Sequence, residues 1–294
     1  MKLFLKKCAF FGLGLMVLNG LIFLIMDPVY SQKGYRHHFF KRVDEMQKMS
    51  LRTAVFSDSH GQALNNDMLN AAGIVNFSIG TDSYPDMLMK LRYLTHHRIL
   101  NRVVLATDYH LFTQYRENIN NQKDSKSLEY TVPVLSVIKR FVPLLNPYSR
   151  DIFLRIVTKE KDGRPRTPWQ EMSGTQRLKS TEERVKKQFP TDILAKTQRD
   201  AFEQIVRLCK QEGFSVVGVR YPLADTYQNV MKQTGFDFNR VDRYIREAGI
   251  PNLDYLDHFS SEEDSDSYFK DQDHVNKKGS AVLTQLLAGD LSKY

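Results

Sequence analysis

The feature that most constrains the fold is a set of short apolar runs that stop abruptly at small or polar residues. Thr53–Phe56 stops at Ser57, and Arg102–Ala106 stops at Thr107. Between the two runs, residues 85–97 carry apolar side chains at the helical period. Strands that alternate with helices in this way predict an α/β fold, a three-layer sandwich around a central parallel sheet.

Later parts of the chain continue the same alternation. Further strands are expected at residues 73–79, 214–219 and 253–256. A long amphipathic helix is predicted before the second of these, with Thr191 as its N-cap and Gly213 as its stop. The sheet is therefore expected to include residues from both halves of the chain.

Residues 112–190 break the alternation and are predicted to form an insertion over the sheet. The insertion contains an amphipathic stretch at residues 132–145 and the only tryptophan, Trp169, in a Pro- and Gly-rich loop with Arg164 and Arg166. An aromatic ring beside guanidinium groups suits a sugar or an acidic polymer. A tryptophan that anchors its loop is the more common arrangement, and both interpretations stay open.

The N-terminus has the composition of a membrane anchor. Lys2, Lys6 and Lys7 precede an apolar run at residues 8–26, which has about the 20 residues needed to cross a bilayer. Positive charge at this end favours a cytoplasmic N-terminus. A cleaved signal peptide is the alternative, although its apolar region is usually shorter and ends at small residues.

Three parts of the chain follow from this pattern. We expect a cytoplasmic tip and transmembrane anchor at residues 1–29, a juxtamembrane tether at 30–50 and a globular domain at 51–294. The domain is expected outside the cytoplasm, on the periplasmic face of the inner membrane or in the extracellular space. The prediction of the membrane as a partner rests on the N-terminal helix alone.

Charge and cysteine content narrow the choice of partners. The formal net charge is +8, which suits anionic lipid or an acidic polymer as well as nucleic acid. No nucleic-acid recognition motif stands among the basic residues, so nucleic acid is not a predicted partner. Cys8 and Cys209 are the only cysteines, and Cys8 lies in the expected anchor, so the domain has no internal disulfide.

The turn after the first strand carries side chains that can act in catalysis or bind a metal ion. The sequence there is Ser57-Asp58-Ser59-His60-Gly61. The carboxyl ends of parallel strands are where open α/β folds place their active sites. Two chemistries fit this turn: Ser59 as a nucleophile, or Asp58 and His60 as a metal-binding D-x-H pair.

A second motif near the C-terminus favours the nucleophile. Asp271 and His274 stand three residues apart, just before the expected last helix. At this spacing the carboxylate can reach the imidazole and fix its tautomer. The imidazole can then take the proton of a serine hydroxyl and return it later.

These motifs resemble those of the SGNH (GDSL-like) hydrolase superfamily. The resemblance lies in three blocks, which are Phe56-Ser57-Asp58-Ser59-His60, Asn76-Phe77-Ser78-Ile79-Gly80 and Asp271-Gln272-Asp273-His274-Val275-Asn276 with Gly279. It implies a flavodoxin-like SGNH fold over residues 51–110 and 190–288. It also implies a catalytic triad of Ser59, His274 and Asp271, and an oxyanion hole made by the amides of Ser59 and Gly80.

The third block departs from the family pattern. Where the family has an asparagine after the third strand, this chain has Asp108, followed by Tyr109 and His110. An ionised aspartate cannot donate a hydrogen bond to an oxyanion. Another donor completes the hole, or the two backbone amides suffice, or Asp108 binds substrate. His60, His110 and Trp169 are further candidates for substrate binding, and His60 can equally serve a structural role.

The metal interpretation resembles the opening motif of metallophosphoesterases. Such sites need further ligands in G-D, G-N-H-D/E and H-x-H motifs, and these motifs are absent from the sequence. A metallophosphoesterase that uses Asp58 and His60 is therefore the weaker hypothesis, and neither a metal nor a cofactor is predicted.

The triad and the expected location together suggest a function. We expect an O-acyltransferase that O-acetylates a cell-envelope or exported polysaccharide through an acyl-serine intermediate. An esterase with the same triad is the first alternative, and a catalytically silent assembly component of a polysaccharide machine is the second. Acetyl-CoA is absent outside the cytoplasm, so a multi-spanning membrane partner is expected to hand over the acyl group.

Overall fold

The computed structural model describes residues 2–96, 100–128, 167–262 and 264–294. The chain divides into two compact units. One comprises residues 1–40 and 129–166, and the other comprises residues 41–128 and 167–294. The predicted amphipathic stretch at 132–145, together with Arg164 and Arg166, lies outside the described residues.

The first unit contains a long N-terminal helix, α1 (Lys2–Lys33), and the start of α2 (Tyr35–Lys48). Within the described residues, only the segment Lys2–Ile22 is a helix long and apolar enough to cross a membrane, with a mean hydropathy of 1.5. A signal sequence near an N-terminus has the same properties. Anchoring and the side of the membrane therefore stay predictions.

The second unit is built on five parallel strands, as predicted. In spatial order they are β2 (Ile74–Asn76), β1 (Thr53–Phe56), β3 (Arg102–Ala106), β4 (Ser215–Arg220) and β5 (Asn252–Asp254). The central strands are buried on both faces, which is why they are continuous apolar runs in the sequence. A β2-β1-β3-β4-β5 order is the flavodoxin-like arrangement.

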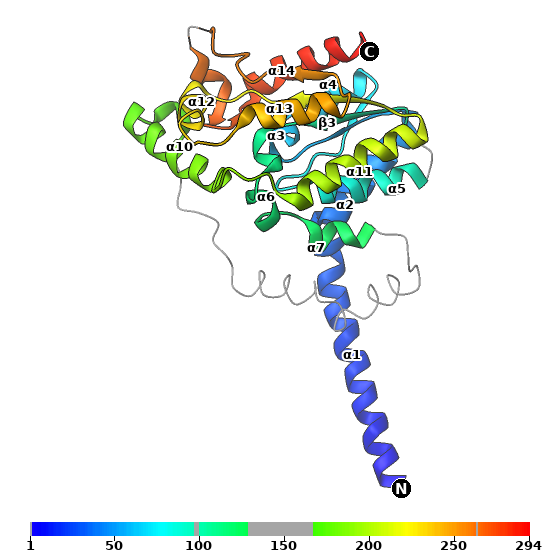
Figure 1. Cartoon of the computed structure of the whole chain (residues 1–294). Coiled ribbons are helices and arrows are strands. Elements are labelled where there is room, and N and C mark those ends of the chain that lie inside the picture. Colours follow the sequence, from blue (N-terminus) through cyan, green and yellow to red (C-terminus); the bar gives the residue numbers. More distant parts are fainter. Residues whose placement is uncertain (1, 97–99, 129–166, 263) are drawn as a thin grey trace. The chain divides into compact units, whose positions relative to one another are not determined.

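Helices cover both faces of this sheet (Figure 1). On one face α5 (Tyr84–His96) packs against α11 (Lys196–Glu212), and on the other α4 (Asn66–Ala71) packs against α14 (Lys277–Leu291). Two further helices of this unit are α12 (Asp225–Met231) and α13 (Phe238–Glu247). The three-layer α/β prediction is confirmed.

The start of α11 differs from the prediction. Thr191 does not cap the helix, which begins at Lys196 after an N-cap, Ala195, that has no side-chain hydrogen bond. The Thr191 hydroxyl instead accepts the N–H of Ile193, and Leu194 forms an isolated antiparallel bridge with Thr113. This bridge holds the segment extended and delays the helix. The predicted end of α11 is confirmed, because Gly213 adopts a left-handed conformation with φ of +74° after the last helical residue.

The described parts of the predicted insertion form four short helices and one longer helix. They are α6 (Tyr115–Asn118), α7 (Gln122–Ser125), η2 (Lys126–Leu128), η4 (Trp169–Glu171) and α10 (Gly174–Gln188). A capping box at Ser173 and Gln176 starts α10. As shown below, α6 and α10 contribute buried side chains at the carboxyl edge of the sheet.

The order of the strands places a crevice at that edge. The chain leaves β1 toward β2 on one side, whereas β3 lies on the other side of β1. Connections that diverge from neighbouring strands open a crevice at their carboxyl ends, the usual ligand site of such sheets. Ser59 follows β1 and Asp108 follows β3, so the predicted site residues lie at this switch point.

Candidate active site

Ser59 is the first residue of the short helix α3 (Ser59–Gln62), directly after the turn that ends β1. The Asp58 side chain caps this helix by accepting the N–H of His60 at 3.0 Å. Backbone N–H groups in a first helical turn have no acceptor within the helix. The turn therefore presents both the Ser59 hydroxyl and its amide at the sheet edge.

Gly61 allows α3 to pack this closely on the strand ends. A Cβ at this position would lie 2.4 Å from the Ser57 Cβ, and 2.7 Å from both the Ser78 and the Tyr221 hydroxyl oxygen. The Gly61 N–H also donates to the Ser57 hydroxyl at 3.1 Å. Only glycine fits, and the close packing fixes the direction of Ser59.

The C-terminal motif forms a small hairpin of β6 (Phe269–Asp271) and β7 (His274–Val275), just before α14. The structure brings the predicted triad together here. His274 Nε2 lies 2.8 Å from Ser59 Oγ, and His274 Nδ1 lies 2.8 Å from Asp271 Oδ1. This continuous chain of contacts is the arrangement of a serine nucleophile, its base and an orienting carboxylate.

The electrostatic environment of His274 favours its charged form. Burial opposes the imidazolium, but contacts with Asp271 and Asp273 raise the pKa of His274 to about 9. At neutral pH the resting imidazole is therefore mostly protonated, and the base form becomes available as the pH rises toward this value.

The amide of Gly80, predicted to line an oxyanion hole, lies beside the nucleophile. A Cβ built on Gly80 would lie 3.9 Å from the Ser59 Cβ. The Gly80 N–H donates to Gln62 Oε1 at 2.8 Å, and the Gly80 carbonyl accepts from Asn121 at 2.8 Å. Asn121 holds the loop in place, and the side-chain oxygen of Gln62 occupies the Gly80 amide that was predicted to face an oxyanion.

Asp108 does not face Ser59 as a donor would. Its side chain is buried, with Oδ2 accepting from His60 Nδ1 at 3.0 Å and Oδ1 accepting the N–H of Tyr221 at 2.9 Å. The carboxylate thus accepts from two buried donors, a role that fits aspartate at this position. The structure thus gives Asp108 a role that none of the three options named, which is to hold the ring of His60.

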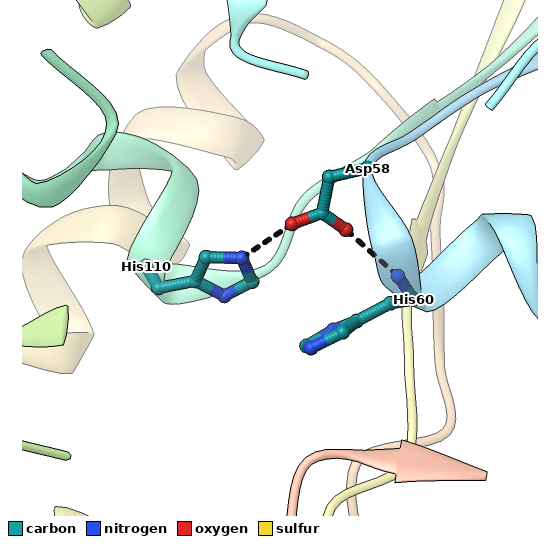
Figure 2. Close-up of side chains that lie close together, drawn as sticks. All are labelled: Asp58, His60 and His110. Atoms are coloured by element: carbon teal, nitrogen blue, oxygen red, sulfur yellow. Dashed lines mark hydrogen bonds and ion pairs between the residues drawn. The ribbon is translucent and has the colours of Figure 1, made fainter. Parts of the chain in front are cut away.

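Asp58 and His110 form a second buried cluster beside His60 (Figure 2). Asp58 Oδ2 lies 2.7 Å from His110 Nε2 and also accepts from the Arg116 guanidinium of α6. Burial alone would raise the pKa of Asp58, but Arg116 and the two histidines hold it well below its usual value. Burial lowers the pKa of His110, so the main charge partner of Asp58 is the Arg116 guanidinium.

Among the described residues, two groups of side chains have donor atoms close enough together for a metal ion: Asp58 with His60 and His110, and His60 with Asp273 and His274. In the first group, the guanidinium of Arg116 already bonds the Asp58 carboxylate. In the second group, Arg184 bonds the Asp273 carboxylate at 2.8 Å. An arginine bonded to each carboxylate, buried in the case of Arg116, repels a divalent cation, so the residues do not fit the metallophosphoesterase hypothesis.

Trp169 is buried in the described structure, with 1% of its surface exposed. Its indole N–H donates to Asp266 at 3.0 Å, and the Arg177 guanidinium lies over its ring at 5.4 Å. A ring enclosed in this way supports the loop-anchoring interpretation over sugar binding. His60 and His110 are also buried, so as the structure stands none of these side chains forms an open binding surface.

Among the residues that the sequence did not predict for the site are Arg116, Arg184, Gln188 and Asp273. Arg184 and Gln188, on α10, donate to Asp273 Oδ2 at 2.8 and 3.0 Å. Asp273 stands inside the C-terminal motif, so its position next to His274 was a usable signal. The other three come from the insertion, where no motif marks them.

Comparison with known proteins returned neither a family model nor a curated protein that matches this chain. Among solved structures, a GDSL-like lipase from Bacteroides thetaiotaomicron is 12% identical, covers 88% of this chain and 97% of its own, and has a TM-score of 0.44. A lipase/acylhydrolase from Enterococcus faecalis is 12% identical, with coverage of 82% and 95% and a TM-score of 0.39. An acetylxylan esterase from Geobacillus stearothermophilus, solved as a catalytic mutant, is 8% identical, with coverage of 81% and 92% and a TM-score of 0.38.

Proposed function

We propose that this chain is an SGNH-type serine enzyme that transfers an acyl group, and that its substrate is an O-acetylated or acetyl-accepting polysaccharide. The observation that carries the proposal is the chain of contacts from Ser59 Oγ through His274 to Asp271, at 2.8 Å for each step. Its location at the switch point of a flavodoxin-like sheet adds support.

The chemistry follows from the geometry. His274 Nε2, in its neutral form, takes the proton of Ser59 as Oγ attacks the acyl carbonyl of the donor ester. Asp271 keeps the Nδ1 proton of His274 in place and stabilises the imidazolium. The imidazolium then protonates the leaving alcohol, and an acyl-serine remains. Water or a sugar hydroxyl, deprotonated by His274, completes the cycle.

The negative charge on the carbonyl oxygen needs hydrogen-bond donors. The amides of Ser59 and Gly80 are the donors at hand, and the Gly80 amide becomes available when Gln62 Oε1 moves away. Loss of one oxyanion donor typically costs about 3 kcal/mol of barrier. Movement of Gln62 is thus a required step of substrate binding in this mechanism.

The expected location of the domain at a membrane favours transfer to a polysaccharide over simple hydrolysis. An apolar N-terminal helix suits an enzyme held at a membrane, where exported polymers pass. An acyl donor delivered through the membrane by a multi-spanning partner would supply Ser59 outside the cytoplasm. Full activity of the purified chain on polymer and a soluble donor, at the rate seen in membranes, would count against such a partner.

The experiment uses the full-length chain in detergent with an activated acetyl ester, with and without an acetylatable polysaccharide. We expect release of the alcohol in both cases, and transfer of the acetyl group to hydroxyls of the polymer in the second. Ser59→Ala is expected to lower the activity at least about 1,000-fold, because the nucleophile is lost. Acetate release without transfer would assign the esterase alternative.

The same variant addresses the catalytically silent alternative. A silent assembly component would keep its cellular role after Ser59→Ala and lose it only on deletion of the chain. Persistence of ester cleavage in Ser59→Ala, together with loss on chelation of metal, would overturn the serine mechanism altogether.

A further inference from the structure

Two carboxylates flank the same ring nitrogen of His274. Asp271 Oδ1 lies 2.8 Å from Nδ1, and Asp273 Oδ1 lies 3.2 Å from it, close but without the alignment of a hydrogen bond. Their surroundings differ: the Asp271 side chain is 36% exposed, whereas that of Asp273 is 1% exposed. A charge in the less exposed position is screened less by water and salt.

The other oxygen of Asp273 is held by the helix α10. Arg184 Nε donates to Oδ2 at 2.8 Å and Gln188 Nε2 donates to it at 3.0 Å. Gln188 is itself fixed by the Tyr227 hydroxyl, which donates to its Oε1. These contacts occupy Oδ2 and leave Oδ1 turned toward His274, where it has no hydrogen-bond partner among the described residues.

His60 lies on the other side of Asp273. Its Nε2 is 3.7 Å from Asp273 Oδ2, and its ring centroid is 5.1 Å from that of His274. Asp108 binds the opposite ring nitrogen of His60. The charged groups that face His274 are therefore Asp271 and Asp273 on its own hairpin, His60 on α3, and Arg184 on α10 through Asp273.

We propose that Asp273 is a second anion for the catalytic base: Asp271 orients His274, while Asp273 supplies a buried charge whose effect on the imidazole is set by Arg184. The inference rests on the proposed function of Ser59 and His274. In the acylation step the Ser59 proton moves to His274 Nε2, and the Nδ1 proton stays on the ring between the two carboxylates. Asp273 and Arg184 are positioning residues, because neither reaches the reacting atoms.

The two residues should act on His274 with opposite sign. The Asp273 carboxylate stabilises the imidazolium, so its removal lowers the pKa of His274. The Arg184 guanidinium partly neutralises the Asp273 carboxylate and repels the imidazolium. Removal of the guanidinium therefore raises the pKa of His274. The raised pKa of His274, attributed to contacts with both carboxylates, agrees with this arrangement.

The test is a titration of the histidine rings by NMR in the full-length chain, in detergent, with labelled histidine. The His274 signal is assigned by its loss in His274→Gln. Relative to wild type, Asp273→Asn should titrate about 1 pH unit lower, and Arg184→Gln should titrate higher. Arg177→Gln is the matched control, because Arg177 lies on the same helix at 20% exposure against 24% for Arg184, and pairs with Asp266. The control should leave the titration unchanged.

Unchanged titrations in both site variants, or shifts in the same direction, would overturn the inference. A purely structural role would lower stability without producing opposite shifts. The acid limb of the pH profile of kcat/KM should move as the titration does. The titration needs no substrate, so opposite shifts in a chain that cleaves no ester would support the electrostatic inference while the proposed function fails.

Discussion

The side chain of Gln62, one helical turn after Ser59, accepts the Gly80 N–H, which in the proposed mechanism is a donor to the oxyanion. In Gln62→Glu, a carboxylate should hold the amide more firmly and repel the developing negative charge. We expect kcat/KM to fall at least about tenfold, because a charged acceptor bonds more strongly than a neutral one. Esterase assays on the purified variant measure the effect.

Gln62→Ala is the matched control for this prediction. It removes the competing oxygen and leaves the amide free, so its kcat/KM should stay at or above that of wild type. A large loss in Gln62→Ala would instead show that the glutamine side chain itself donates to the oxyanion. Equal activity in Gln62→Glu and wild type would contradict the proposed displacement.

At the scale of the elements, the packing of α3 on the strand ends controls the site. Gly61→Ala would push a methyl group against Ser57 and Tyr221, at distances no side chain tolerates. We expect a loss of about 1–3 kcal/mol in the free energy of unfolding and a matching loss of activity as Ser59 shifts. Gly289→Ala, in α14 with open space around it, should leave both nearly unchanged. Thermal and denaturant unfolding would measure the difference, and equal stabilities would contradict it.

The elements also show what sequence can and cannot predict. The strands could be predicted because a fully buried parallel strand must be a continuous apolar run, as in Arg102–Ala106. The triad could be predicted because Asp271 and His274 are local to one motif. Thr191 failed as a cap because a tertiary contact, the bridge of Leu194 with Thr113, overrode the local preference.

The arginines that pair with the carboxylates of the site could not be predicted from the sequence. Arg116 bonds Asp58 across 58 positions, and Arg184 bonds Asp273 across 89. No periodicity or spacing marks such a pair, and a chain with 42 lysines and arginines offers many equivalent candidates. Only the fold brings the two ends of the insertion to the sheet edge.

At the scale of the whole molecule, the buried carboxylates link stability to pH. The pKa values of Asp58 and Asp273 are held well below the usual 3.8 by their cationic partners, against the opposing effect of burial. Their contribution to stability is fully present above that value and is lost as the pH falls through their folded-state pKa values. We therefore expect the free energy of unfolding to decline below about pH 4.

Denaturant unfolding followed by circular dichroism at a series of pH values checks this expectation. Asp58→Asn should be less stable than wild type at neutral pH, and the difference between the two should shrink in acid. A constant difference down to about pH 2 would show that the Asp58 charge does not contribute.

The thiol content of the chain offers a practical route to the site. Cys209 is fully buried in α11, and burial raises the pKa of its thiol to about 12, so it is unreactive in the folded state. The one other cysteine, Cys8, lies in the N-terminal apolar helix and can be replaced. In a Cys8→Ser, Ser59→Cys chain, a thiol-directed probe would react at a single place beside His274. Two substitutions are therefore enough to label the position of the nucleophile specifically.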